Sequence, residues 1–292
     1  MTTHEKKRVL ITGASGFTGR YVWAACEAAG YYPIQPLHGF NLSSIESCRA
    51  TIEGTKPDYV IHLAAISFVS HPDHSAFYQI NTVGTINLLQ AIRDVGLIPK
   101  HLIIASSANV YGNVPTQSQP ISEKQPPAPE NHYASSKLAM EYMASRWFDT
   151  FPITITRPFN YTGVGQNELF LVPKIIKHFT NHNPVIKLGN LDIARDYTDV
   201  RDVAEMYVNL LNAPKLQSCT VNVCSGNMYS LIQIIQLLSD KTQHEIEMIS
   251  DNSFVRSNEI LSIRGSNEKF MSNIGYEMKF PFETTLGWML DT

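Results

Sequence analysis

The sequence predicts an α/β protein built on a doubly wound parallel sheet, and three observations support this prediction. Short apolar segments alternate with amphipathic segments through the first half of the 292 residues. Such alternation is typical of a parallel sheet with helices on both faces. A glycine-rich turn, TGASGFTG, joins the first apolar segment to the first amphipathic one. The length is sufficient for a large core in one domain or in two closely joined domains.

The elements follow in order along the chain. We expect strands at 8–12, 32–37, 58–63, 100–105 and 152–156, and helices at about 17–29, 43–53, 78–95 and 133–149. The first strand, RVLIT, is short and apolar, as buried parallel strands are. Ser43 and Glu46 have the spacing of a capping box at the start of the second helix. The segment 113–130 is rich in Pro, Gln and Ser, and we expect it to be a loop that borders a substrate cleft.

The glycine-rich turn predicts a dinucleotide site. Gly13, Gly16 and Gly19 have GxxGxxG spacing at the first strand–helix junction. A strand, a tight turn and a helix N-terminus bring backbone N–H groups and the positive helix end against a pyrophosphate. A glycine triplet alone is also found in ordinary turns, but this position favours a dinucleotide. The cofactor-binding residues expected in the turn are Gly13, Ser15, Gly16, Phe17 and Thr18.

A tyrosine and a lysine four residues apart predict redox chemistry. Tyr133 and Lys137 share one face if residues 133–149 form a helix. A free phenol has a pKa of about 10, and a neighbouring ammonium group would lower that pKa so that the tyrosine exchanges a proton near neutrality. Ser107 lies upstream in SSANVYG. Without Ser107 and the glycine turn, a surface pair on a helix would be the simpler interpretation of the tyrosine and the lysine.

Motifs along nearly the whole chain resemble the extended short-chain dehydrogenase/reductase family, which comprises nucleotide-sugar epimerases, dehydratases and 4-reductases. They are TGASGFTG, VIHLAA at 60–65, INTVGTINLL at 80–89, SSANVYG at 106–112, YASSK at 133–137, TRPFN at 156–160 and RDYTDVRDVA at 195–204. The stretch TRPFNYTGVGQNELFLVPKIIKHF is most similar to the GDP-4-keto-6-deoxy-mannose reductases of that family. The resemblance implies a Rossmann-type NAD(P)-binding domain, 1–160 plus 194–229, and a smaller nucleotide-sugar-binding domain, 161–193 plus 230–292.

The resemblance also implies catalytic roles. Ser107 would hydrogen-bond the reacting oxygen, Tyr133 would exchange its proton, and Lys137 would hold the phenol and the nicotinamide ribose. Ser106 is the competing hydroxyl, and its distance from VYG favours Ser107 instead. Dehydratases of the family have an acidic pair directly after this Ser or Thr, where this chain has Ala-Asn at 108–109. Neither side chain can act as a general acid or base, so reduction or epimerisation at a sugar C4 is favoured over dehydration.

The expected cofactor is NADPH or NADH. NAD-dependent members usually place an Asp at the end of the second strand, where it binds the adenosine ribose diol. Aligning the segment GYYPIQPLHGF, residues 30–40, puts Leu37 at this position, followed by His38. His38 could contact a 2′-phosphate or be an exposed loop histidine. No Arg lies nearby in the sequence. The resemblance assigns further cofactor contacts to Asn41 and Leu42 at adenine, to Leu63, Ala64 and Ala65 at the dinucleotide backbone, and to Asn81 near the nicotinamide-side ribose. A helix cap is the alternative for Asn81.

Arginines are the expected ligands of the substrate diphosphate. Arg195 and Arg256 are candidates because a guanidinium fork matches phosphate oxygens, although a solvated surface charge is the common alternative. Glu259 lies three residues after Arg256 and could accept a hydrogen bond from a ribose hydroxyl; the family usually has Pro where this chain has Ser257. By resemblance, Asn160 contacts the diphosphate or sugar, and Val172 lies near the base.

Composition narrows the class of protein. The formal charge of −3 gives no basic footprint for nucleic acid. No apolar run has the length of a membrane span, and the N-terminus has no signal-peptide hydrophobic region. The four cysteines lack the paired spacing of a zinc site, so no metal is expected. We expect a cytoplasmic protein, and a homodimer joined through the helices near 78–95 and 133–149.

Together these observations predict an NAD(P)H-dependent 4-reductase of a nucleotide-linked 4-keto-6-deoxyhexose. The substrate expected by resemblance is GDP-4-keto-6-deoxy-D-mannose, and the product a GDP-6-deoxyhexose of the D-rhamnose or D-talose type. A nucleotide-sugar 4-epimerase uses the same residues and is the alternative among enzymes. A catalytically idle nucleotide-binding regulatory protein is the alternative from another class, and the intact serine, tyrosine and lysine oppose it.

Overall fold

The centre of the protein is a six-stranded sheet. The structure, a computed structural model, describes residues 6–69, 71–254 and 260–292. The strand order is β2-β1-β3-β4-β5-β9, and every neighbouring pair is parallel. The strands are β1 (Arg8–Thr12), β2 (Tyr32–Ile34), β3 (Tyr59–His62), β4 (His101–Ala105), β5 (Ile153–Pro158) and β9 (Cys219–Val223). The predicted doubly wound α/β fold is confirmed.

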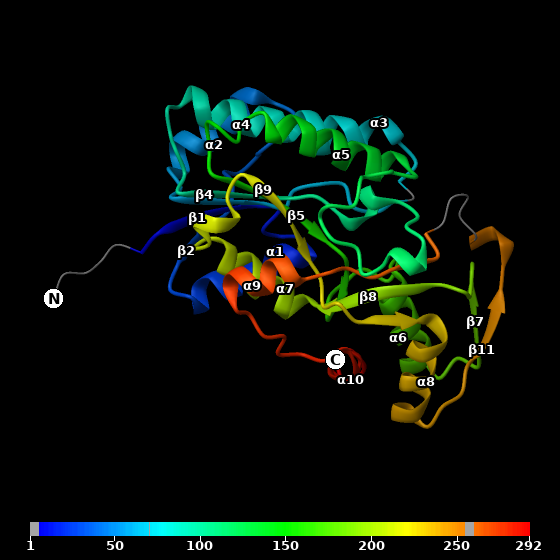
Figure 1. Ribbon diagram of the computed structural model, residues 1–292. Helices are drawn as coiled ribbons and strands as arrows, with labels where there is room; N and C mark the ends of the chain where they lie inside the picture. The colour runs from blue at the N-terminus through cyan, green and yellow to red at the C-terminus, as the bar shows by residue number, and fades with distance from the viewer. Residues whose placement is uncertain (1–5, 70, 255–259) are drawn as a thin grey trace.

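Helices cover both faces of this sheet (Figure 1). One face carries α1 (Phe17–Ala28), α7 (Val200–Leu210) and α9 (Glu268–Ile274), and the other carries α2 (Ile45–Thr55), α4 (Thr85–Asp94) and α5 (His132–Ser145). Successive residues of a strand point to opposite faces. Val9 and Ile11 therefore pack with α1 and α7, whereas Leu10 packs with the helices on the other side. Burial on both faces explains why the strands are apolar throughout.

Two predicted element boundaries differ from the structure. β2 ends at Ile34 rather than at residue 37, because Pro36 has no N–H to donate to the neighbouring strand. The N-cap of α2 is Ser44, whose hydroxyl accepts from the Ser47 N–H at 3.1 Å. The N–H of Ser43 instead donates to the Asn41 side chain. The expected capping box of Ser43 and Glu46 is therefore wrong.

The helix expected at 78–95 consists of three consecutive parts. It begins with α3 (His74–Phe77), continues as a π-helical turn, Tyr78–Gly84, and ends as α4. Asp73 caps its start by accepting from the Ser75 N–H at 2.9 Å. π-helical turns within α-helices are frequent at functional sites, and this one packs against α5.

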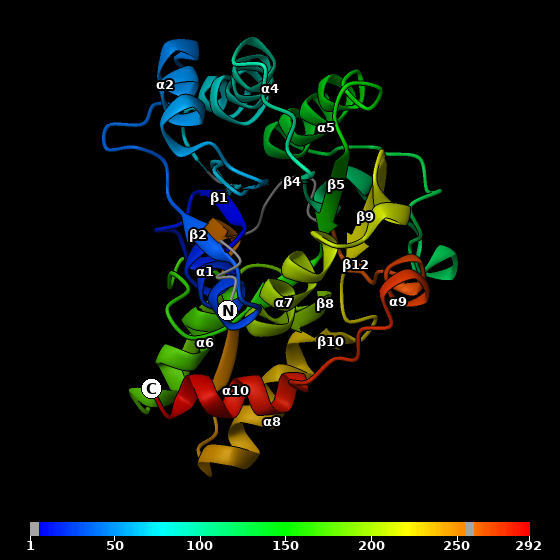
Figure 2. The ribbon, with the colours of Figure 1, turned by 90° about the vertical axis from the view of Figure 1, so that its left-hand side faces the viewer.

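A second group of elements lies away from α2, α4 and α5, at the end of the molecule marked by α8 and α10 in Figure 2. Its strands are β6 (Asn160–Thr162), β7 (Val185–Leu188), β8 (Ala194–Asp199), β10 (Met228–Ser230), β11 (Glu247–Ser250) and β12 (Ser262–Ile263). Its helices are α6 (Leu171–Thr180), α8 (Leu231–Thr242) and α10 (Phe282–Leu290). β8 pairs with β6, β10 and β12, and β7 pairs with β11. Ile175, Phe179 and Leu286 belong to a separate apolar core here.

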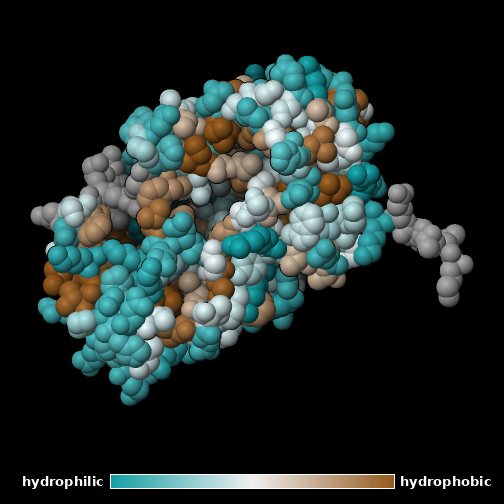
Figure 3. Space-filling view, turned by 180° about the vertical axis from the view of Figure 1, so that it is seen from behind, coloured by the Kyte–Doolittle hydropathy of each residue, from teal (hydrophilic) through white to brown (hydrophobic). Residues whose placement is uncertain are grey.

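Short helical turns complete the chain at Ala108–Tyr111, Thr116–Ser118, Pro214–Leu216 and Asn252–Phe254. The expected loop at 113–130 packs against the segment 261–266: Ile121 bridges to Gly265, and the Gln119 side chain donates to the Ser262 carbonyl at 3.0 Å. On the opposite side of the molecule, hydrophobic residues lie on either side of a central hollow (Figure 3). Within the described ranges, no helix has both the length and the apolar character that a membrane span requires.

Candidate active site

The predicted functional segments meet at one edge of the central sheet. Gly13 follows β1, Gln35 follows β2, Leu63 follows β3, and Ser107 lies just beyond β4. Parallel strands bring their carboxyl ends to the same edge, so residues far apart in sequence become neighbours. The strand order changes direction at β1, whose two neighbours are β2 and β3. Ligands of open α/β sheets bind at such a switch point.

The glycine turn brings backbone segments very close together. Gly13 has φ +76°, and a Cβ there would lie 3.0 Å from the backbone nitrogen of Ala64. A Cβ on Gly19 would lie 2.1 Å from the Gly13 carbonyl oxygen, so α1 packs directly on the turn. The Gly16 N–H donates to the same carbonyl at 3.0 Å. This bare turn at the start of α1 fits the pyrophosphate of a dinucleotide.

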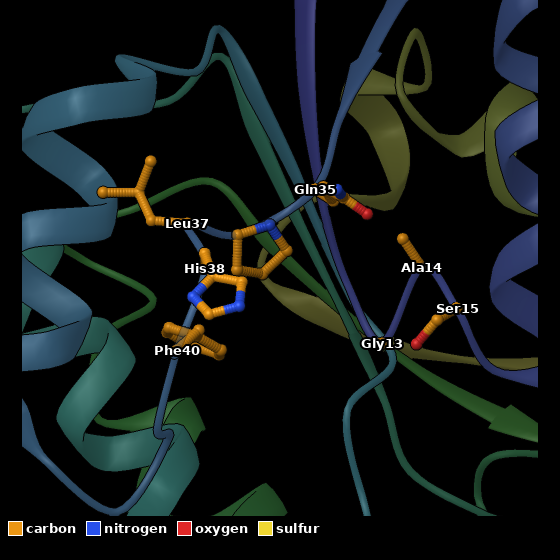
Figure 4. Close-up of a pocket in the computed structure, with 8 residues that line it drawn as sticks. Gly13, Ala14, Ser15, Gln35, Leu37, His38 and Phe40 are labelled. Carbon is orange, nitrogen blue, oxygen red and sulfur yellow. The ribbon is translucent and has the colours of Figure 1, made fainter.

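A cavity of about 310 Å³ extends from the turn toward the end of β2. Figure 4 shows that Gln35 points toward Ala14 across this cavity, whereas Leu37 points away toward a neighbouring helix. A Cβ on Gly54 of α2 would lie 3.2 Å from Leu37 Cδ1, which identifies that helix. Gln35 is the residue directly after β2, and Leu37 also lines the cavity although its side chain is directed to α2. His38 lines the cavity too and is exposed.

The other expected cofactor residues have varied surroundings. Leu42 is 6% exposed and belongs to the core beside α4, so its side chain is committed to packing. Asn41 is exposed, and its side-chain oxygen accepts from the Ser43 N–H. Thr18 and Phe17 both contact Tyr161: the two hydroxyls are 2.8 Å apart, and the rings stack. The half-buried residues Leu63, Ala64, Ala65 follow β3 directly.

Ser107, Tyr133 and Lys137 come together as the sequence predicts. Asn131 starts α5 by accepting from the Ala134 N–H at 2.9 Å, which places Tyr133 and Lys137 in the first turns. The Ser107 side chain lies close enough to Tyr133 to lower the pKa of its phenol, and the Lys137 ammonium donates to the Ala105 carbonyl at 2.8 Å. All three residues are buried. The site therefore holds two neighbouring hydroxyls and a cation away from bulk water.

Burial controls the protonation of this site. Desolvation raises the Tyr133 pKa to about 12, although the hydrogen bond from Ser107 lowers it in part. The expectation that Lys137 moves this pKa toward neutrality is wrong for this structure, because desolvation is the largest effect and the ammonium is directed to Ala105. Desolvation also lowers the Lys137 pKa to about 8, against the attraction of Glu141. At neutral pH the phenol is protonated and the lysine is charged.

Ser106 has a different role from Ser107. Its hydroxyl donates to Glu141 at 2.5 Å, and the same carboxylate is bonded to Arg157 in a buried ion pair. The Arg157 guanidinium also lies 4.7 Å from the centre of the Tyr111 ring. Ser106 is therefore committed to this network, which leaves Ser107 to face the tyrosine. The sequence analysis did not identify the pair, whose glutamate is one helical turn after Lys137.

Asn81 lies within the π-helical turn and is 1% exposed. Its side chain accepts from the Ile66 N–H at 2.9 Å and donates to the Ile66 carbonyl and to the Ser136 hydroxyl. Ser136 in turn donates to the carbonyl of Tyr133. Asn81 therefore does not cap a helix but joins the segment after β3 to the helix of Tyr133 and Lys137.

The expected substrate residues belong to the second group of elements. Asn160 is exposed at the start of β6. Arg195, on β8, donates from Nη1 to the carbonyls of Ala194 and Leu261. Val172 is 2% exposed in the core under α6, so its side chain is committed to packing. Arg256 and Glu259 lie outside the described residues.

Comparison with known proteins identifies the family. Residues 30–289 match the GDP-mannose 4,6 dehydratase family. The chain belongs to this family. It is an NAD(P)-dependent oxidoreductase of the short-chain dehydrogenase/reductase type.

Two similar relatives within this family act on GDP-linked 6-deoxy sugars by name. GDP-6-deoxy-D-talose 4-dehydrogenase of Aggregatibacter actinomycetemcomitans is 35% identical, over 94% of this chain and 93% of that one. GDP-6-deoxy-D-mannose reductase of Pseudomonas aeruginosa is 33% identical, over 96% and 95%. The structure of RMD from Pseudomonas aeruginosa complexed with NADPH superposes with a TM-score of 0.91 at 32% identity, covering 98% of each chain. Relatives of lower identity include UDP-glucose 4-epimerases and 4,6-dehydratases.

Two residues follow Ser107 at the positions where dehydratases were expected to have an acidic pair. Ala108 is 3% exposed and has no ionisable group. Asn109 contributes its backbone N–H, which donates to the Ser107 hydroxyl at 3.2 Å. Neither residue supplies the acid or base that loss of water needs, so the structure gives no reason to revise the expectation against 4,6-dehydration.

The structure also adds a site residue of this family member that the sequence analysis did not name. Tyr161 is half-buried, and it raises the pKa of Tyr133, which places the two phenols near each other. Its hydroxyl bonds to Thr18 on α1. An aromatic residue directly after TRPFN was the available signal, but only the pairing of β6 with β8 places it beside the catalytic helix.

Proposed function

We propose that this protein reduces the 4-keto group of a GDP-linked 4-keto-6-deoxyhexose with NADPH or NADH. The product is a GDP-6-deoxyhexose of the D-rhamnose or D-talose type. The observation that supports the proposal is that Ser107, Tyr133 and Lys137 lie together and buried, with no acidic residue at 108–109. The names of the two similar relatives support the GDP-linked 6-deoxy sugar.

The proton chemistry follows from the site. A bound nicotinamide supplies the hydride that reaches C4. Tyr133 stays protonated at neutral pH because its pKa is raised to about 12, and it gives this proton to the oxygen on C4. An alkoxide is a stronger base than a phenolate, so the transfer is downhill. Ser107 donates to the same oxygen, and the Lys137 ammonium, bonded to the Ala105 carbonyl, adds a positive charge to the site.

We propose that segments 1–160 and 194–229 hold the cofactor, and that segments 161–193 and 230–292 hold the nucleotide sugar. β8 belongs to the first set of segments but pairs with strands beside the second, and its Arg195 would contact the nucleotide sugar. The carbonyl bonds of Arg195 fix its guanidinium beside β12, close in sequence to Arg256. A diphosphate bound by these arginines lies far from C4, so the contact contributes equally to ground-state and transition-state binding.

The test is direct. The protein is incubated with GDP-4-keto-6-deoxy-D-mannose and NADPH or NADH, and the loss of reduced nicotinamide is followed by absorbance. The expected result is stoichiometric conversion to a GDP-6-deoxyhexose, whose configuration at C4 is then assigned by NMR. Absence of oxidation with both cofactors, in protein shown to bind them, contradicts the proposal.

A nucleotide-sugar 4-epimerase is the second candidate, favoured by the epimerases among the more distant relatives. An epimerase retains NAD through its cycle, whereas a reductase exchanges its cofactor each turnover. NAD that copurifies with the protein, together with conversion of a nucleotide sugar to its 4-epimer without added cofactor, supports epimerisation. Rapid exchange of bound NADPH supports reduction.

A further inference from the structure

Residues 105–107, at the end of β4, lie along one face of α5. Lys137 and Glu141 are one helical turn apart, so their side chains lie on the same side of this helix. The Ala105 carbonyl accepts from the Lys137 ammonium at 2.8 Å. The Ser106 hydroxyl donates to the Glu141 carboxylate at 2.5 Å. The catalytic serine is the next residue of the chain, so its position depends on these two bonds.

The Glu141 carboxylate is fixed by partners on the sheet. It is buried, and a buried carboxylate needs hydrogen bonds and an opposite charge. Arg157, on β5, supplies both, since its Nε donates to Oε1 at 2.9 Å and its Nη2 to Oε2 at 2.5 Å. The guanidinium lies against the Tyr111 ring, whose hydroxyl donates to Asn222 on β9 at 2.7 Å. Contacts from β5 and β9 therefore hold the carboxylate one turn away from the lysine.

The charged and titratable groups around Lys137 come from α5, β5 and β3. On α5 they are Glu141 and the neutral Tyr133, and on β5 Arg157 lies behind the glutamate. His62, on β3, has a pKa lowered to about 3 by burial and by the lysine charge, so it is neutral at pH 7. Desolvation lowers the Lys137 pKa to about 8, and Glu141 opposes this effect. The glutamate therefore favours the charged form of the lysine.

We propose that Glu141 is a positioning residue of the reductase site, which keeps the Lys137 ammonium charged and fixes residues 105–107 against α5. It acts through Lys137 and Ser106 and does not itself exchange a proton with the sugar. A cation in the site stabilises the negative charge that develops on oxygen during reduction. The proposal rests on the proposed function for the reaction, but the charge of the lysine can be measured without a substrate.

The first test measures the protonation of Lys137 directly. The protein is labelled with ¹³C at lysine Cε, and the Lys137 signal, identified by its loss in Lys137→Met, is followed by NMR as the pH changes. Glu141→Gln keeps the size of the side chain but removes its charge, so the midpoint should fall by about one pH unit or more. Asp199→Asn is the matched control, because it removes a buried carboxylate paired with Arg201 at the start of α7, on the other face of the sheet. Its midpoint should equal that of the wild type.

A double variant keeps this test decisive if Glu141→Gln does not fold. Glu141→Met combined with Arg157→Met replaces the buried pair by apolar side chains, which is often neutral for stability. The midpoint should fall here too, because Glu141 is the charge that acts on Lys137. Melting temperatures identify folding defects. A wild-type midpoint in a folded variant without the glutamate overturns the proposal.

The second test follows the reaction. If the Lys137 ammonium is required, kcat falls as the pH rises through the pKa of this lysine. A lower pKa in Glu141→Gln should therefore move this alkaline limb to lower pH, whereas Asp199→Asn should leave the limb where it is. An alkaline limb that does not move in folded Glu141→Gln contradicts the role of the glutamate.

Ser106→Ala tests the anchoring of residues 105–107. It removes the bond to the carboxylate but leaves the ion pair, so misplacement of the catalytic serine should lower kcat about ten- to hundredfold with little change in KM. Ser145→Ala, which removes a half-buried hydroxyl of α5 bonded to the Tyr142 carbonyl, is the control. Unchanged kcat in folded Ser106→Ala overturns the anchoring role. Wild-type protein that oxidises no NADPH contradicts the proposed function alone, because the NMR titration still decides the role of Glu141.

Discussion

At the scale of single residues, desolvation shifts the pKa values of Tyr133 and Lys137 in opposite directions. Burial disfavours the charged form of either group. It therefore raises the Tyr133 pKa to about 12 and lowers the Lys137 pKa to about 8. Glu141, one turn along α5, opposes the effect on the lysine. The site holds a neutral acid and a cation at neutral pH, which is the state that ketone reduction requires.

Tyr133→Phe should lose most of its turnover while it retains its fold and its cofactor affinity. The phenyl ring keeps the edge-on packing against Phe77 at 5.9 Å between ring centres, and only the acidic hydroxyl is removed. General acid catalysis typically contributes about a hundred- to ten-thousand-fold. The measurement is kcat for reduction, together with NADPH titration. Near wild-type kcat in the folded variant would remove Tyr133 as the proton donor.

Lys137→Met should be more stable than the wild type at pH 7, by at most about 3 kcal/mol, at 1.36 kcal/mol per pKa unit. The pKa of Lys137 falls from 10.5 unfolded to about 8 folded, so the unfolded chain binds more protons between these values. Wild-type stability therefore rises with pH across this window. Urea unfolding of both proteins from pH 7 to pH 10 should show their difference shrinking. A difference independent of pH contradicts the lowered pKa.

At the scale of elements, the closest packing lies where α1 meets the turn after β1. Gly19 has the Gly13 carbonyl oxygen where a Cβ would be, 2.1 Å away. That atom belongs to the backbone of the cofactor-binding turn and cannot rotate aside. The glycine is therefore required for the distance between helix and strand, and not only for the turn itself.

Gly19→Ala should lower stability by at least about 1–3 kcal/mol, the usual cost of overpacking, and should weaken dinucleotide binding. Gly54→Ala is the matched control, since it lies in α2 and its nearest neighbour is the half-exposed Leu37 side chain. Alanine there should be neutral or stabilising by about 0.5–1 kcal/mol. Denaturant unfolding and NADPH titration measure both effects. Equal stability of the two variants would show that the turn can move.

At the scale of the whole molecule, α5 presents apolar side chains to solvent. Tyr142 is 62% exposed and Met143 43% exposed, and Val83 on the adjoining π-helical turn is 39% exposed. Trp147, in the segment 133–149 expected to join the dimer, instead stacks on Phe151 of the same chain. Leu138 also packs inward, against the core beside Val110. The predicted homodimer therefore depends on a smaller surface than the sequence suggests.

The homodimer is best tested with Tyr142→Glu. A charge at the centre of this face should convert a dimer to a monomer without unfolding it, because the wild-type side chain is largely exposed. Sedimentation velocity over a range of concentrations measures the change, and Glu168→Lys, on an exposed residue of the other group of elements, is the control. A concentration-independent monomer for the wild-type protein would contradict the prediction.

The spacing of nearby residues in the sequence was sufficient to predict a large part of the fold and of the candidate site. The glycine turn, the pair Tyr133 and Lys137 four residues apart, and the alternation of apolar segments depend on neighbours within a few residues, where helix and strand periods are fixed. From these motifs we predicted the α/β fold, the family and the position of Ser107 beside Tyr133. The first strand, Arg8–Thr12, was predicted to the residue.

Only the tertiary structure showed the surroundings of the candidate site, because these depend on distances between segments that are far apart in the sequence. Leu37 is only three positions after Ile34, yet the structure is needed to show that β2 ends at Ile34 and that Gln35 points across the cavity. Arg20 and Gln35 line a second hollow because α1 packs beside β2. The opposite pKa directions of Tyr133 and Lys137 arise from burial, which exists only once the chain has enclosed them. The spacing of residues in the sequence therefore predicted the redox chemistry. The packing of the folded chain determined the protonation of Tyr133 and Lys137 and the residues that surround them.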